Sequence, residues 1–173
     1  MRRADQLEYT SLDDFPLSWR FAEDADRWVV LPEADLRQFR PLSAACAHGH
    51  WHRLVTPTAD HLMAAGQTGP RFETRLAEYR IAGDWTAAEE SERVAKFLRP
   101  LVPIRDADTL LFFWGAWCAV ETTWDLVLRY WSDFCYPSDD SNVIVPFVGD
   151  RLVVHAERLV WVAPRNRTVS FEG

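Results

Sequence analysis

Three histidines, His48, His50 and His52, alternate with single residues in one short segment of the chain. In a strand all three imidazoles would point to one side, whereas in the helix that we expect here His48 and His52 share a face. Two helical histidines four residues apart can bind zinc when a third ligand completes the set. Asp60 and His61 follow in the next loop and can approach this face. One hypothesis is therefore a metal centre of His48, His52, Asp60 and His61; the other is a set of exposed or half-buried histidines without a ligand.

A second group of polar residues, rich in carboxylates, occupies the segment 121–140. Acidic side chains beside an aromatic anchor suit a basic protein partner, because opposite charges steer the encounter and the ring supplies contact area. As structural alternatives, Glu121 can stabilise the first turn of a helix, and the Asp139–Asp140 pair can form a solvated turn. The predicted partner-binding residues are Glu121, Asp125, Asp133, Tyr136, Asp139 and Asp140.

Several familiar catalytic and cofactor-binding motifs are absent from this sequence. Its seven glycines are scattered, and neither a glycine-rich phosphate loop nor a Gly-x-Ser-x-Gly motif occurs. The three cysteines form no Cys-x-x-Cys pair, so neither a thioredoxin-like motif nor a cysteine-based zinc site is indicated. We therefore expect no cofactor, and the sequence favours a binding protein over an enzyme.

Length, charge and hydropathy limit the classes of protein to which this chain can belong. The chain has 173 residues, a formal net charge of −7 and 48% hydrophobic residues. Such a chain can bury one complete core, which predicts a single domain over residues 1–173. Its net acidity argues against nucleic-acid binding, because phosphates attract clustered basic side chains. No apolar run reaches the roughly 18–20 residues that span a bilayer, and the polar N-terminus lacks the features of a signal peptide, so we expect a cytoplasmic protein without a membrane partner.

Hydrophobic periodicity predicts an α+β fold for the chain. In this fold, N-terminal helices pack on a mostly antiparallel sheet of about four to five strands. The predicted strands cover 19–21, 110–114, 143–148, 151–155 and 159–162. The predicted helices cover 32–40, 41–54, 71–79, 85–98 and 119–134. The last is a central amphipathic helix, because its apolar residues from Val120 to Phe134 follow helical spacing as one stripe.

The segment 109–164 resembles an uncharacterised bacterial family of small acidic soluble proteins, a domain of unknown function. The likeness rests on a hydrophobic strand followed by Val120-Glu121-Thr122-x-Trp124, then Trp131-x-x-Phe134, then paired aspartates before a closing sheet. Phe39-Arg40-Pro41-Leu42-Ser43, Trp51 and Asp60-His61 look like the N-terminal portion of that family. The resemblance implies a fold and no activity. Small acidic bacterial proteins of this general kind also include immunity proteins, which is an analogy only.

These observations leave three hypotheses for function. The first is a cytoplasmic bacterial protein-binding factor, an immunity or regulatory protein, that occludes a basic partner such as a toxin. The second is a metal-dependent hydrolase or metal-binding protein that uses His48, His52 and His61 with Asp60. The third is a structural homodimer held by part of the large aromatic content, since tryptophan is enriched at interfaces.

Overall fold

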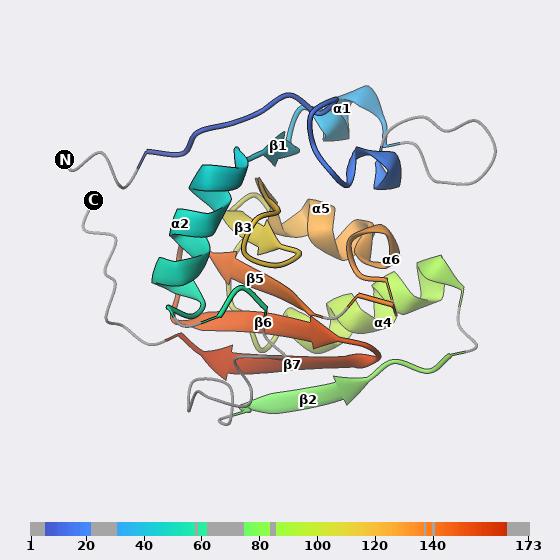
Figure 1. The fold of residues 1–173 in the computed structure, drawn as a ribbon. Helices are drawn as coiled ribbons and strands as arrows, with labels where there is room; N and C mark the ends of the chain where they lie inside the picture. The colour runs from blue at the N-terminus through green and yellow to red at the C-terminus, as the bar shows by residue number, and fades with distance from the viewer. Residues whose placement is uncertain are drawn as a thin grey trace.

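A computed structural model of the chain describes residues 6–21, 31–57, 59–61, 75–83, 86–136, 138–139 and 141–165. Its centre is a sheet of seven antiparallel strands in the order β1-β4-β3-β5-β6-β7-β2 (Figure 1). The strands are β1 (Arg40–Pro41), β2 (Ala77–Arg80), β3 (Thr109–Phe113), β4 (Ala119–Thr123), β5 (Asn142–Pro146), β6 (Arg151–Ala156) and β7 (Leu159–Pro164). The helices are α1 (Glu33–Leu36), α2 (Ala44–Leu54), α4 (Ala87–Leu98), α5 (Trp124–Arg129) and α6 (Trp131–Phe134).

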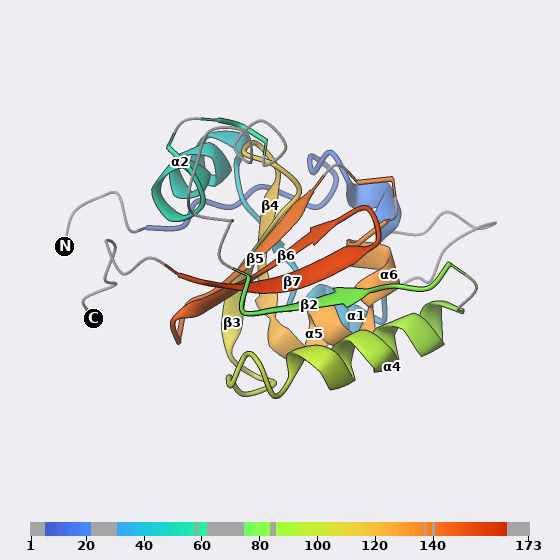
Figure 2. The same cartoon turned by 90° about the horizontal axis from the view of Figure 1, so that it is seen from below.

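Helices cover both faces of this sheet, as the view from below makes plain (Figure 2). Helix α2 lies on one face, and α4, α5 and α6 lie on the other. Alternate residues of β3 serve the two sides: Leu110 and Phe112 join the core under α4, α5 and α6, whereas Leu111 and Phe113 join the core under α2. The uninterrupted apolar run in β3 is thus explained by burial on both faces.

The three C-terminal strands are where the sequence predicts them. Strands β5, β6 and β7 pair in succession as an antiparallel meander. Gly149 has a φ of +86° in the first connection and Glu157 a φ of 55° in the second. Positive φ in short connections matches the twist that hairpin turns require.

The predicted count of four to five strands is wrong, because β1, β2 and β4 also join the sheet. Residues 119–123 were predicted to be the start of a long helix, but they pair with β3 along their whole length. Val120 on this strand is buried in the same core as Trp124, Trp131 and Phe134 on the two short helices that follow. The apolar residues of these three elements therefore have the spacing expected of one helical stripe. The β-branched residues at 120, 122 and 123 favour the strand.

Several other boundaries also differ from the prediction. Residues Ser18–Arg20 form a 3-10 turn instead of a strand, and Ala77–Arg80 form β2 where a short helix was predicted. In the sequence, Asp84 is a plausible N-cap for the predicted helix 85–98, but it lies outside the described residues. Helix α4 begins instead with a capping box, in which the Thr86 hydroxyl accepts from the Glu89 amide and the Glu89 carboxylate accepts from the Thr86 amide. Among the described residues, no helix combines the length and apolar character needed to cross a bilayer.

Candidate metal centre

Helix α2 carries two of the predicted metal ligands. It begins after Ser43, whose hydroxyl accepts a hydrogen bond of 3.3 Å from the Cys46 amide. Trp51 is fully buried under the helix and meets the Phe113 ring at 5.6 Å between centroids. With that face of the helix against the sheet, His48 and His52 lie together on a partly exposed face, one turn apart.

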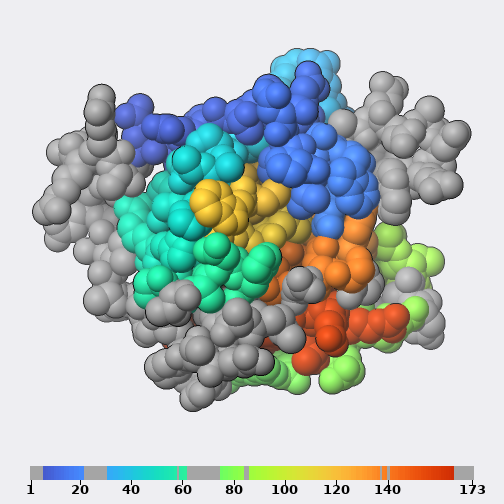
Figure 3. Space-filling model, viewed as in Figure 1, coloured from blue at the N-terminus to red at the C-terminus, as the bar shows by residue number. Residues whose placement is uncertain are grey.

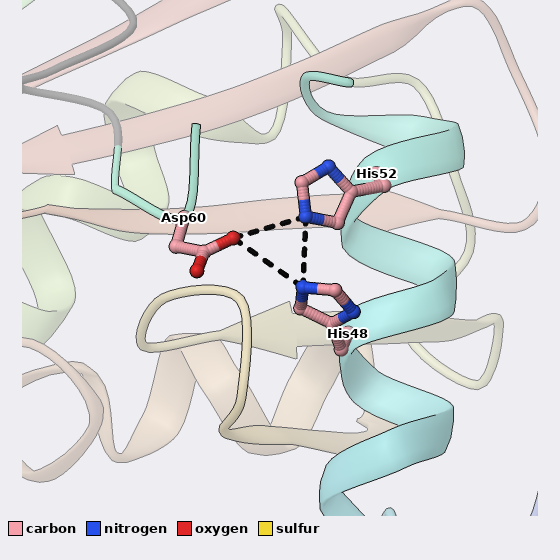
Figure 4. A group of neighbouring side chains, drawn as sticks. All are labelled: His48, His52 and Asp60. Carbon is pink, nitrogen blue, oxygen red and sulfur yellow. Dashed lines mark hydrogen bonds and ion pairs between the residues drawn. The ribbon is translucent and has the colours of Figure 1, made fainter. Parts of the chain in front are cut away.

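Asp60 completes a triangle of donor atoms with these two histidines (Figure 4). The Nε2 atoms of His48 and His52 are 2.9 Å apart, and His52 Nε2 lies 2.9 Å from Asp60 Oδ1. The distance from His48 Nε2 to the same oxygen is 3.4 Å. Three potential ligand atoms therefore converge on one point, which is the arrangement that a metal ion requires.

Two backbone contacts hold the loop that carries Asp60. The Trp51 indole donates to the Ala59 carbonyl at 2.7 Å, and the Ala116 amide donates to the Asp60 carbonyl at 3.0 Å. The first contact ties the loop to α2, and the second ties it to the turn between β3 and β4. Asp60 is thereby positioned by two elements that are distant from each other in the sequence.

Trp117, on the same β3–β4 turn, contacts two of the three candidate ligands. Its indole N–H donates to Asp60 Oδ2 at 3.2 Å, and its ring stacks on the His48 imidazole at 3.8 Å with an interplanar angle of 20°. The Trp117 hydrogen bond, followed by that from His52 and the charges of His48 and His52, lowers the pKa of the Asp60 carboxyl. Trp117 was not among the predicted site residues, because no spacing pattern in the sequence links it to the histidines.

His61 does not join this group among the residues that the structure describes. Its ring lies so close to Gly115 that a Cβ at that glycine would be 3.5 Å from the imidazole. Gly115 has a φ of +112°, a conformation that glycine adopts without strain. The predicted four-residue set thus becomes a three-residue set of His48, His52 and Asp60.

Two of the predicted partner-binding acids, Glu121 and Asp125, are not part of this group and have partners within the chain. Glu121 is 9% exposed, and it accepts a hydrogen bond of 2.6 Å from the Tyr9 hydroxyl and forms an ion pair of 3.0 Å with Arg40. Asp125 on α5 pairs with Arg129 one turn later, at 2.6 Å. Both carboxylates therefore have a cation within the chain, and Arg129 is shared between Asp125 and Asp35, to which it donates two further hydrogen bonds.

Asp139 is part of a buried polar network. Arg20 donates two hydrogen bonds, of 3.0 Å and 2.6 Å, to the Asp139 carboxylate. The Arg20 guanidinium carbon also lies 4.1 Å from the centroid of the Tyr136 ring. The Asn142 side-chain amide donates to Asp139 at 2.9 Å and lies 3.2 Å from His155 Nδ1. Burial opposes ionisation of Asp139, but the Arg20 and Asn142 hydrogen bonds outweigh it and lower its pKa. Burial also lowers the pKa of His155 to about 4.

Of the two remaining predicted acids, Asp133 and Asp140, the structure describes only Asp133. Asp133 is half-buried on α6, and burial raises the pKa of its carboxyl to about 6. Asp140 lies outside the described residues. A partner-binding role for the six predicted residues stays a prediction, and the geometry assigns Asp139 and Glu121 a stabilising role inside the fold.

Comparison with known proteins places the chain in a family. No curated protein and no solved structure is significantly similar to it. The family model described as "Protein of unknown function (DUF2947)" matches residues 9–157, which is most of the chain and more than the segment 109–164 that carried most of the resemblance. The match includes α2, the Asp60 loop and the β3–β4 turn. The chain therefore belongs to the DUF2947 family of proteins of unknown function.

Proposed function

We propose that this protein binds a divalent transition metal, with zinc as the best fit, through His48, His52 and Asp60. The observation that supports the proposal is the convergence of three donor atoms within 3.4 Å of one another. Two imidazole nitrogens and one carboxylate oxygen are ligands that zinc accepts in proteins. Calcium and magnesium prefer oxygen ligands, so this donor set does not suit them.

Hydrogen bonding alone does not give each side of the triangle its own proton. A single proton on His52 Nε2 can be shared between His48 Nε2 and Asp60 Oδ1, which leaves the His48–Asp60 separation of 3.4 Å without one. Each neutral imidazole presents at Nε2 either one N–H or one lone pair, and the ionised carboxylate presents only lone pairs. If both histidines carry a proton at Nε2, two N–H groups face each other across 2.9 Å. If either or both nitrogens lack that proton, at least one nitrogen lone pair faces the Asp60 oxygen. A metal cation removes the conflict, because it accepts all three lone pairs at once.

The size of the triangle also suits a small metal ion. Zinc lies about 2.0–2.2 Å from nitrogen and oxygen ligands, so two ligands are about 3.0 Å apart at a right angle and about 3.4 Å apart at the tetrahedral angle. The three observed separations of 2.9, 2.9 and 3.4 Å span this range. Little rearrangement is therefore needed to accommodate the ion.

Three protein ligands leave a coordination position for water. The side chains of His48, His52 and Asp60 are 33%, 28% and 42% exposed, so solvent and small molecules reach the site. Zinc in a three-ligand site lowers the pKa of its bound water to about 7, which is the chemistry of zinc hydrolases. Hydrolysis is thus the reaction class that the open position favours, and metal binding is the step to test first.

The test is zinc titration of the full chain, purified without a histidine tag and stripped with a chelator. We expect one zinc per chain for the wild type. His48→Ala, His52→Ala and Asp60→Asn should each weaken binding by more than the roughly 10–100-fold that loss of an outer hydrogen-bond partner costs. His61→Asn is the matched control, because His61 is exposed and adjacent to Asp60 but outside the triangle.

Two results would contradict the proposal. The first is a wild-type protein that binds no stoichiometric zinc, cobalt or manganese. The second is a set of ligand variants that bind zinc as tightly as His61→Asn does. Circular dichroism of each variant distinguishes a lost ligand from a lost fold.

A further inference from the structure

We infer that Trp117 is a positioning residue of this metal site, which makes Asp60 bind the metal through one oxygen only. The inference depends on the proposed metal-binding function and adds to it the coordination number of the ion. Trp117 itself is not a ligand, and it acts through Asp60 and His48.

The two oxygens of Asp60 have different partners. Oδ1 faces both histidine Nε2 atoms, at 2.9 and 3.4 Å, whereas Oδ2 accepts the indole N–H of Trp117 at 3.2 Å. A carboxylate can bind a metal with one oxygen or chelate it with both. Because the indole occupies Oδ2 and turns it away from the histidines, only Oδ1 remains for the metal. The protein then supplies three ligand atoms, and one exogenous ligand completes a four-coordinate ion.

The second contact of Trp117 orients a histidine. Its ring stacks on the His48 imidazole at 3.8 Å, almost parallel, which restrains rotation of the imidazole about its χ2 angle. With that rotation restrained, the His48 Nε2 lone pair stays directed at the centre of the triangle. Partners of this kind commonly fix ring orientation at metal sites.

The turn that carries Trp117 is well anchored. Its ends are joined by the Trp114 amide, which donates to the Cys118 carbonyl at 2.9 Å, and Ala116 bonds to the Asp60 backbone. In the space-filling view this turn reaches the surface beside α2 (Figure 3, gold atoms). Trp117 is 52% exposed, so it contributes less to the core than a buried tryptophan would. Its placement is therefore explained better by its contacts with Asp60 and His48 than by burial.

The test uses Trp117→Phe, which keeps an aromatic ring over His48 but removes the N–H donor. Oδ2 of Asp60 is then free to chelate the metal and raise its coordination number. With Co²⁺ as the probe, we expect the visible absorption bands to weaken, because four-coordinate cobalt absorbs more strongly than five- or six-coordinate cobalt. We expect zinc affinity to fall by roughly 10–100-fold. Trp19→Phe is the matched control, since Trp19 is also an exposed tryptophan, at 44%, and contacts Arg20 and Tyr136.

The cobalt spectrum decides the inference. A weaker spectrum in Trp117→Phe, with that of Trp19→Phe unchanged, supports it. An unchanged spectrum overturns it even if zinc binding is weaker, because the tryptophan would then stabilise only the fold. If the wild type itself binds neither cobalt nor zinc, the metal-binding function fails and the inference fails with it.

Discussion

Protonation of His155 should set much of the acid sensitivity of the folded protein. The side chain is 1% exposed, and burial lowers its pKa to about 4 from an ordinary value of 6.5. Its Nδ1 atom faces the amide of Asn142, whose nitrogen also donates to Asp139. A neutral imidazole accepts at Nδ1 in this arrangement, whereas a charged one would place an N–H against the amide donor.

The size of the effect follows from the two pKa values. The unfolded chain binds the proton with a pKa near 6.5 and the folded chain with a pKa of about 4, so protonation favours unfolding. Stability from this group is complete above pH 6.5 and is lost as the pH falls toward 4. The linkage relation gives a loss of about 2 kcal/mol between pH 8 and pH 5, and about 3 kcal/mol below pH 4.

The assay is urea unfolding of the wild type and of His155→Asn from pH 8 to pH 5, with a chelator present. Asparagine places its Oδ1 near the position of Nδ1 and does not titrate. Its lost ring volume costs stability at every pH, so only the difference between the two pH profiles matters. We expect this difference to shrink by about 2 kcal/mol from pH 8 to pH 5. Parallel profiles would refute the reasoning, and His61→Asn, at an exposed site, controls for histidine loss in general.

Two further predictions concern carboxylates. Asp133→Asn should stabilise the protein by about 1–2 kcal/mol at pH 8 and by less than about 0.5 kcal/mol at pH 4, because burial raises the Asp133 pKa to about 6 and the ionised form is the unfavourable one. Equal gains at both pH values in urea unfolding would contradict this. Asp139→Asn should cost about 3–5 kcal/mol at pH 7, because it leaves the Arg20 guanidinium buried without its anion. In the same assay, a cost below about 1 kcal/mol would show that Arg20 finds another partner or solvent.

Local periodicity was sufficient to predict part of the candidate metal site. His48 and His52 share a face because they are four residues apart in a helix, and that helix begins at a serine cap. Asp60 was predicted from its proximity in the chain, and the structure brings it to both histidines. His61 was equally close in sequence but lies against Gly115. Proximity in sequence alone does not determine which of two adjacent loop side chains faces a helix.

The error in the sheet has a related cause. Two residues in β1 and four in β2 are too few for a periodic signal, and they become strands only because β4 and β7 supply backbone partners. Residues 119–123 have partners in β3 and β1, which outweigh the apparent helical spacing. Strand pairing between distant segments is a tertiary interaction, so a pattern within one segment does not reveal it.

The sequence by itself determined the local elements with strong signals: the β5–β7 meander, the buried strand β3, the helices α2 and α4, and the pair of histidines on α2. Their signals are periodic spacing, capping residues and turn residues, which act within a few positions of one another. Only the tertiary structure decided that Trp117 bonds to Asp60, 57 residues earlier, and that Arg20 pairs with Asp139, 119 residues later. Such contacts depend on how whole elements pack, because burial and hydrogen bonding of the complete chain select them.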